Sequence, residues 1–305
     1  MTAPRITLAR QLHAAGESAA ALERRARRGT DIRVRRGVYA SAEEWRASDQ
    51  TGRHLARMAS AQAMAAAPLT FSHASAALAH GIPLLGRIPE QVHVTGEPGG
   101  GRRSRAGVVW HEADLGADEV EPQGASMATV PWRTAFDLAA CDGAAVGVVA
   151  LDHVLRASGQ PDRIRERVQD ALDARRPFRG ARRVDAVLRI ATGLADTPLE
   201  SLSLQRFDEH GLPRPLQQQR FWVDGHEYFA DFYWRRWDMI GEADGRRKYE
   251  ADAARDGRHP RDVLWAEKLR EDALRTVVRR FVRWTWADAL DGARLADRIR
   301  AAALR

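Results

Sequence analysis

Three acidic side chains near the C-terminus have the type and spacing to bind a metal ion. Asp231 lies in the apolar run 229–234, and Glu242 and Asp244 lie in the run 239–244. Both runs read as strands joined by a tight turn near Arg235-Arg236, so Glu242 and Asp244 share one face of a strand beside Asp231. Carboxylates that crowd together repel unless a cation neutralises them, and oxygen ligands suit Mg²⁺ or Mn²⁺. The hairpin therefore predicts a hard-metal site.

The elements around this hairpin have a definite predicted order. A helix over 198–208 is capped by Thr197, with Pro198 in its first turn, and a strand over 217–223 ends at the hairpin turn Asp224-Gly225. The two acidic strands follow. A helix over 262–275, a strand over 277–286 and a last helix over 287–303 complete the chain.

The order helix, three strands, helix, strand is the core order of the restriction-endonuclease-like PD-(D/E)xK superfamily. The residues resemble, in particular, an uncharacterised family related to the very-short-patch-repair endonuclease. The resemblance covers residues 196–305 and is carried by Glu200, Ala230-Asp231-Phe232, Glu242-Ala243-Asp244-Gly245, Arg270-Glu271-Asp272 and the arginines of 279–283.

The resemblance implies Mg²⁺-dependent cleavage of phosphodiester bonds. Asp231 and Glu242 would hold the ion with the carbonyl of Ala243, and Glu200 would bind it through water or orient the nucleophile. The family's lysine, two residues after the strand glutamate, is Asp244 here. The positive charge that the family's lysine places beside the phosphate would therefore have to come from Lys248 or from an arginine of the last strand, Arg279, Arg280 or Arg283.

Two other interpretations of the acidic cluster stay open. Asp244-Gly245 is also a turn signal, and Glu242 could pair with a neighbouring arginine, since the chain is rich in them. The domain could equally be a degenerate nuclease fold retained for binding. The aromatic residues of these strands are typical of a core rather than of a surface that stacks on bases.

The N-terminal segment reads as two short helices and a basic ribbon. Ile6, Leu8, Leu12 and Ala15 fit one helical stripe; a second helix starts at Ser18 and ends at Gly29, and residues 31–40 alternate like strands around Gly37. This layout is typical of a winged helix-turn-helix that binds duplex DNA. The predicted DNA-binding residues are Arg24, Arg25, Arg27, Arg28, Arg33, Arg35 and Arg36.

The same segment resembles the N-terminal domain of type IV (AbiEi-type) antitoxins, which share the ending Arg35-Arg36-Gly37-Val38-Tyr39. That resemblance implies a promoter-binding repressor with a toxin partner. Two alternatives remain: a helical cap whose arginines are only solvated, and a winged helix that binds protein.

Residues 50–157 predict a small α/β unit. We expect helices over 51–66 and 72–80, strands over 91–95 and 107–112, and a helix from Pro131; the sequences 72–76 and 133–137 again resemble the antitoxins. His73, His93 and His111 fit no compact zinc spacing and lack thiolate support, so they are interpreted as structural. This segment predicts no catalytic site.

Composition limits the function classes. The 305 residues carry a net charge of +7, and only two of the 48 basic residues are lysines. Ten arginines and six acids lie within residues 1–50, which favours a polyanionic partner, although a genome-wide preference for arginine explains the excess equally well. One cysteine excludes a disulfide framework, and no apolar run is long enough for a membrane span. We expect a cytoplasmic protein.

The sequence therefore predicts an α/β multidomain protein with four parts. These are a winged helix-turn-helix (1–47), an antitoxin-like α/β middle domain (48–157), a helical linker (158–195) and a restriction-endonuclease-like domain (196–305). The leading predicted function is Mg²⁺-dependent DNA cleavage by a DNA-binding protein, in DNA repair or phage defence. The alternative is an antitoxin-type transcriptional repressor with an inactive nuclease fold.

Overall fold

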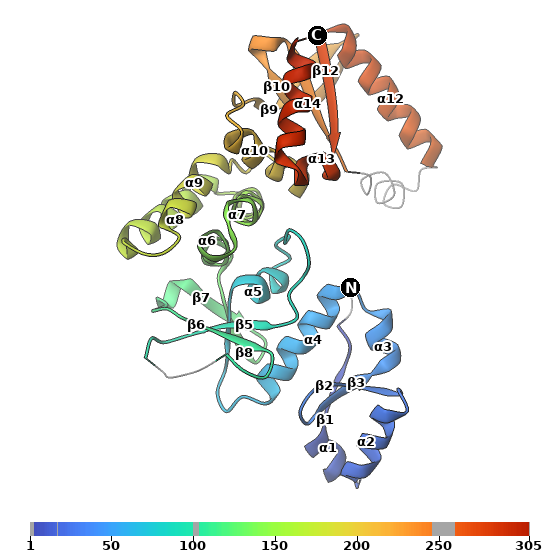
Figure 1. Cartoon of the computed structure of the whole chain (residues 1–305), viewed down its shortest axis with the longest axis vertical. Coiled ribbons are helices and arrows are strands. Elements are labelled where there is room, and N and C mark those ends of the chain that lie inside the picture. Colours follow the sequence, from blue (N-terminus) through green and yellow to red (C-terminus); the bar gives the residue numbers. More distant parts are fainter. Residues whose placement is uncertain (1–2, 17, 100–103, 246–259, 305) are drawn as a thin grey trace. The chain divides into compact units, whose positions relative to one another are not determined.

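The computed structural model divides the chain into two compact units, Met1–Asp142 and Gly143–Arg305 (Figure 1). It describes residues 3–16, 18–99, 104–245 and 260–304. Lys248 lies outside the described residues. Within those ranges, no helix has both the length and the apolar character needed to cross a membrane.

The first unit begins with a small three-stranded antiparallel sheet and its helices. Strand β1 (Ile6–Leu8) leads into α1 (Ala9–Ala14) and α2 (Ala19–Arg27), and β2 (Asp31–Arg35), β3 (Val38–Ser41) and α3 (Ala42–Ala47) follow. The strand order is β1-β3-β2. As predicted, the Ser18 hydroxyl caps α2 by accepting from the Ala21 N–H, and Gly29 follows the helix with a positive φ of 72°.

The predicted first helix starts too early. Ile6 and Leu8 were expected on a helical stripe, but they belong to β1, which pairs with β3 through Ile6↔Ala40 and Leu8↔Val38. The helix begins only at Ala9. β-Branched Ile6 and Thr7 suit a strand, and β3, about 30 residues later, supplies the open edge that makes the strand possible.

A second sheet of five strands forms the rest of this unit, in the order β6-β5-β4-β8-β7. Helices α4 (Gln50–Ala63), α5 (His73–Ala79) and α6 (Pro131–Asp142) accompany it, and Met58, Phe71, Ala76, Val92 and Val94 share its core. The strands are β4 (Thr70–Phe71), β5 (Val92–Gly96), β6 (Val108–Glu112), β7 (Val120–Gln123) and β8 (Ser126–Thr129), with a 3₁₀ turn at Ala117–Glu119. The two strands predicted around the glycine-rich loop do pair, and they run parallel.

The second unit opens with three helices, α7 (Ala144–Ser158), α8 (Pro161–Arg175) and α9 (Ala181–Ile190). These helices pack on one another, and α7 also packs on α10 (Pro198–Glu209). The second unit therefore begins at Gly143, and α7 belongs with the helices that follow it rather than with the sheet that precedes it.

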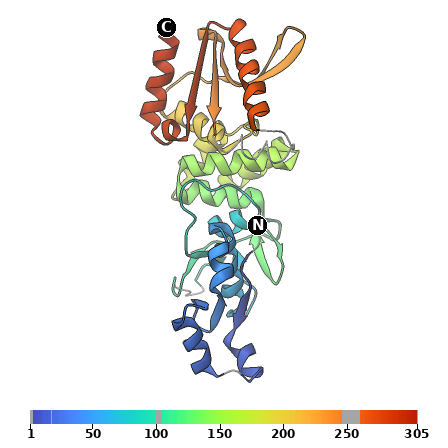
Figure 2. The same ribbon diagram turned by 90° about the vertical axis from the view of Figure 1, so that its right-hand side faces the viewer.

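The remaining elements follow the predicted order. After α10 come β9 (Leu216–Val223), β10 (His226–Trp234), a 3₁₀ turn (Arg235–Trp237), β11 (Met239–Asp244), α12 (Pro260–Thr276) and β12 (Arg280–Thr285). The sheet order is β12-β11-β10-β9, with β12 parallel to β11 and the other pairs antiparallel. Figure 2 shows α12 and α14 (Gly292–Leu304) on either side of these strands. The single last helix expected over 287–303 is two helices, α13 (Trp286–Leu290) and α14, because the chain leaves helical geometry at Asp291.

An aromatic core lies on the α10 side of this sheet. The ring of Phe207 meets Phe232, Trp234 and Trp284 edge to face at centroid distances of 5.3, 5.3 and 5.7 Å. Gly241 sits beneath them, where a Cβ atom would come within 2.7 Å of the rings of Trp234 and Trp284. Only glycine fits there, so β11 can approach the aromatic rings closely at the residue before Glu242.

Candidate functional site

Asp231 and Glu242 lie next to each other at the point where β10 and β11 separate. The last regular pair of the two strands is Phe232↔Gly241, and Asp231 and Glu242 are the next residues along. Instead of continuing the ladder, the Asp231 carboxylate accepts a hydrogen bond of 2.9 Å from the Ala243 N–H. Both acids are buried, at 8% and 6% exposure. The two acids thus lie on neighbouring strands, as predicted.

β10 changes faces at Asp231. Ala230, the residue before Asp231, packs on the α12 face of the sheet with Leu274, and Tyr233 packs against the same cluster. Phe232, the residue after Asp231, packs in the aromatic core on the opposite face. Across the strand pair, Gln218 of β9 has a positive φ of 48° and interrupts the ladder opposite Asp231. This double irregularity turns Asp231 toward the edge of β11, which strict alternation does not predict.

Arg270 neutralises Glu242. Its Nη1 and Nη2 atoms donate to the Glu242 carboxylate at 3.0–3.1 Å, and Nη2 also donates to the Phe229 carbonyl at 2.6 Å. The arginine comes from α12, 28 residues beyond the glutamate. The guanidinium hydrogen-bonds both oxygens of the buried carboxylate. It therefore supplies the positive charge that a metal ion was expected to supply. The alternative in which Glu242 pairs with an arginine is the arrangement found.

Glu200 has a structural task at the start of α10. Its carboxylate accepts from the Asp196 N–H (2.9 Å) and the Thr197 hydroxyl (2.8 Å), while Thr197 accepts from the Glu200 N–H. The Thr197 hydroxyl thus caps α10, and Glu200 ties the helix to the two residues that precede it. The Gln218 amide donates to the same carboxylate at 3.2 Å, so Glu200 connects to the sheet through the residue opposite Asp231.

The carboxylates as arranged do not fit a divalent cation. Arg270 occupies both oxygens of Glu242, and Asp231 uses one oxygen on the Ala243 N–H. In the part of the chain that the structure describes, no three His, Cys, Asp or Glu side chains are placed to hold a metal ion together. Asp244, half-buried at the end of β11, does not complete such a group.

The seven arginines predicted to bind DNA divide into two kinds. Arg25 pairs with the buried Asp31 at 2.9 Å and so ties α2 to β2, and Arg27 pairs with Glu23 at 3.4 Å. Arg35 is half-buried. The remaining four are exposed and form no ion pair within the described residues; they are Arg24, Arg28, Arg33 and Arg36.

Three histidines that are distant in sequence meet in the first unit. The rings of His73 and His111 stack with centroids 3.6 Å apart, and His93 shares a hydrogen bond of 3.0 Å with His111. His73 adopts a positive φ of 49° at the start of α5, where its Nδ1 lies 3.0 Å from the Ser72 hydroxyl. Stacked rings direct their nitrogen lone pairs in parallel planes, which do not converge on one metal ion. Their interpretation as structural residues agrees with this arrangement, but the sequence spacing gave no sign of the cluster.

Buried charges and a further histidine surround this cluster. Arg133 of α6 pairs with Asp137 and with Glu119, each at 2.9 Å. Burial opposes the charge on Arg133, but the two carboxylates outweigh it and the pKa of the guanidinium is raised. His54 of α4 bonds the Pro89 carbonyl and the Ser75 hydroxyl at 2.8 and 2.9 Å. The polar groups thus hold the helices of this unit to its sheet.

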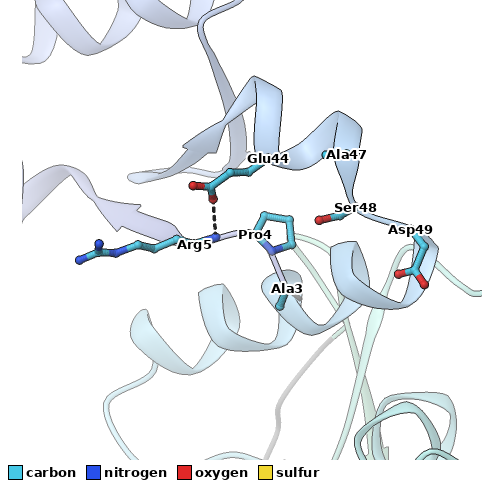
Figure 3. Close-up of a pocket in the computed structure, with 7 residues that line it drawn as sticks. All are labelled: Ala3, Pro4, Arg5, Glu44, Ala47, Ser48 and Asp49. Atoms are coloured by element: carbon cyan, nitrogen blue, oxygen red, sulfur yellow. Dashed lines mark hydrogen bonds between the residues drawn. The ribbon is translucent and has the colours of Figure 1, made fainter. Parts of the chain in front are cut away.

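A hollow of about 590 Å³ lies beside α3, and its acidic residues have structural roles (Figure 3). Its two carboxylates have partners: Glu44 accepts from the Arg5 N–H at 2.9 Å, and Asp49 caps α4 through the Gly52 N–H at 2.7 Å. Pro4 and the short side chains of Ala3, Ala47 and Ser48 form the rest of its wall. Nothing in it is arranged for chemistry.

Comparison with known proteins shows a distant likeness to a solved structure. No protein-family model matches the chain, and no curated protein matches it. Among solved structures, it is similar to the crystal structure of the RV2827C protein from Mycobacterium tuberculosis, with 15% identity and a TM-score of 0.39. The match covers 73% of this chain and 85% of that one.

Proposed function

We propose that this chain is a DNA-binding protein of the repressor type. The observation that carries the proposal is the set of four exposed arginines on α2 and the β2–β3 ribbon that form no ion pair within the described residues. Arg24 and Arg28 lie four residues apart and so share one face of α2, while Arg33 and Arg36 stand on and beside the ribbon. A polyanion such as DNA neutralises the positive charge of this surface, and the release of counterions from its phosphates favours binding.

The order of elements supports a winged helix-turn-helix mode of binding. Strand, helix, helix and two strands, with the first strand paired to the last, match that module, in which the second helix enters the major groove and the ribbon contacts the backbone. In this proposal Arg25 does not read DNA. Its ion pair with Asp31 sets the angle between α2 and the ribbon.

We expect Arg24→Gln combined with Arg28→Gln to weaken DNA binding. The loss of two phosphate contacts lowers the slope of log Kd against log salt by about 2 and the affinity by about tenfold or more at low salt. Fluorescence anisotropy with the promoter region of the protein's own gene and with a scrambled duplex measures both quantities. Arg163→Gln with Arg167→Gln, exposed on α8, is the control of equal charge. Equal binding by the two double variants would contradict the proposal.

Mg²⁺- or Mn²⁺-dependent cleavage at Asp231 and Glu242 stays a prediction and is the second candidate function. The observation in its favour is the adjacency of the two buried carboxylates where the strands separate. In the repressor proposal the same domain is a nuclease-like fold whose glutamate is already neutralised by Arg270, and a toxin is its expected partner by resemblance to type IV antitoxins.

If the second candidate is correct, supercoiled plasmid incubated with protein and either metal is converted to nicked circles. Asp231→Asn keeps the shape of the side chain but removes its charge, and should abolish the conversion. Asp224→Asn, the same change at the exposed turn of the neighbouring hairpin, should leave it intact, since asparagine tolerates the positive φ of 49° there. Plasmid left intact by the unaltered protein in both metals rules cleavage out for this substrate.

A further inference from the structure

An arginine-lined groove runs along the outer strand of the second unit's sheet. β12 is the edge strand, with α14 beside it in Figure 1, and the groove has a volume of about 580 Å³. Helix α12, strand β12 and helix α14 each contribute to its wall. Its lining residues include Arg275, Arg279, Arg280, Phe281, Arg283 and Arg298.

Acidic groups only partly compensate these arginines. Glu271 is shared between Arg275 and Arg283, at 2.7 and 3.1 Å, and Asp288 is shared between Arg298 and the nearby Arg294. Arg279 forms no ion pair within the described residues. Five guanidinium groups thus face two carboxylates, and the groove keeps an excess of positive charge.

The guanidinium groups are held in place before any ligand arrives. Arg275 lies over the face of Phe281, with its Cζ atom 4.4 Å from the ring centroid, and Arg283 lies at 5.8 Å. Arg280 donates to the Trp237 carbonyl at 2.7 Å, yet its buried Nε has no hydrogen-bond partner in the described part of the chain.

The spacing of the arginines selects an extended anion. Arg280 and Arg283 lie about 10 Å apart along β12 and, at this odd spacing, on opposite faces of the edge strand, so a single phosphate group cannot reach both. Successive phosphates of a nucleic-acid strand advance about 3.4 Å along the duplex axis, so three or four of them span that distance. Arginine also matches phosphate oxygens with paired N–H donors.

We propose that this groove binds the phosphodiester backbone of a nucleic acid. It is a contact separate from that of α2, formed by different residues in the other unit, and it rests on the proposal that the protein binds DNA. The backbone runs along β12 and bridges the arginines of α12, β12 and α14. Because these contacts are to phosphates, they add affinity without sequence preference.

Arg279→Gln combined with Arg298→Gln tests the groove in the full-length chain. Both side chains are exposed, and Asp288 keeps its ion pair with Arg294 at 2.9 Å, so the fold should survive. Binding of a labelled duplex of random sequence is measured over a salt series, together with far-UV circular dichroism. We expect about tenfold weaker binding and a salt slope lower by about 2. The Arg163→Gln, Arg167→Gln control should bind like the unaltered protein.

The outcomes separate this inference from the proposed function. A groove variant that binds like the control overturns the inference, while DNA binding by the unaltered protein leaves the repressor proposal standing. If the unaltered protein binds no DNA, both fail. Displacement of the duplex by an equal concentration of inorganic phosphate would identify a small-anion site and would also overturn the inference. Loss of binding in the groove variant, additive with the loss in the Arg24, Arg28 variant, supports it.

Discussion

Mild acid should destabilise the first unit by about 4 kcal/mol between pH 7.5 and pH 5. Burial lowers the pKa of His54 to about 4 and that of His73 to about 3, and these side chains are 0% and 5% exposed. Both groups are thus neutral in the folded protein down to a pH well below the ordinary histidine pKa of about 6.5.

Acid lowers the stability because the unfolded chain takes up more protons than the folded chain. Below pH 6.5 the unfolded chain binds protons that the folded chain refuses, so stability is fully present above pH 6.5 and falls as the pH drops toward 4 for His54 and 3 for His73. At pH 5 each histidine accounts for about 2 kcal/mol. Desolvation also lowers the pKa of His111, to about 3, although this ring is partly exposed.

Urea unfolding followed by circular dichroism at pH 7.5 and at pH 5 measures the loss. His73→Asn removes one titrating group, and asparagine tolerates the positive φ of residue 73, so the pH-dependent loss should shrink by about 2 kcal/mol. His226→Asn, at an exposed position of the second unit, should not change it. A loss that is the same in all three proteins would show that His73 does not contribute to it.

Arg270→Met should lower the stability of the second unit by about 2–3 kcal/mol. The substitution leaves the buried Glu242 carboxylate without its guanidinium, and breaking a fully buried ion pair in this way costs about 3–5 kcal/mol. We reduce that figure because the Arg270 side chain is 23% exposed. Arg275→Met, five residues further along α12, removes a partly exposed pair with Glu271 and should cost less than about 1 kcal/mol.

The same variant tests whether the vacated carboxylates accept a metal ion. If Asp231 and Glu242 then bind Mg²⁺, a concentration ten times the Kd restores about 1.4 kcal/mol by mass action. Mg²⁺ should not stabilise the unaltered protein, in which Arg270 holds Glu242. Thermal unfolding with and without Mg²⁺ measures both effects. An Arg270→Met protein that Mg²⁺ does not stabilise would show that this is not a metal site even when vacated.

Local signals in the sequence were reliable where neighbouring residues decide the structure. Thr197 and Pro198 start α10 as expected, and Asp224 and Gly225 both adopt the positive φ that their hairpin turn requires. The order of elements around Asp231 and Glu242 and the adjacency of these two acids also came from the sequence. Caps, turns and alternation act over a few residues, and these features need nothing more.

Contacts between distant segments were decided only by the tertiary structure. Ile6–Leu8 is a strand because β3 offers it an edge, and His73 meets His111 because β5 and β6 run parallel beside α5. Arg270 reaches Glu242 across 28 residues because α12 packs on that face of the sheet. The sequence by itself determined which acids lie together at the hairpin. Packing decided their counter-charge, because charge pairing depends on distances in space that residue spacing does not encode.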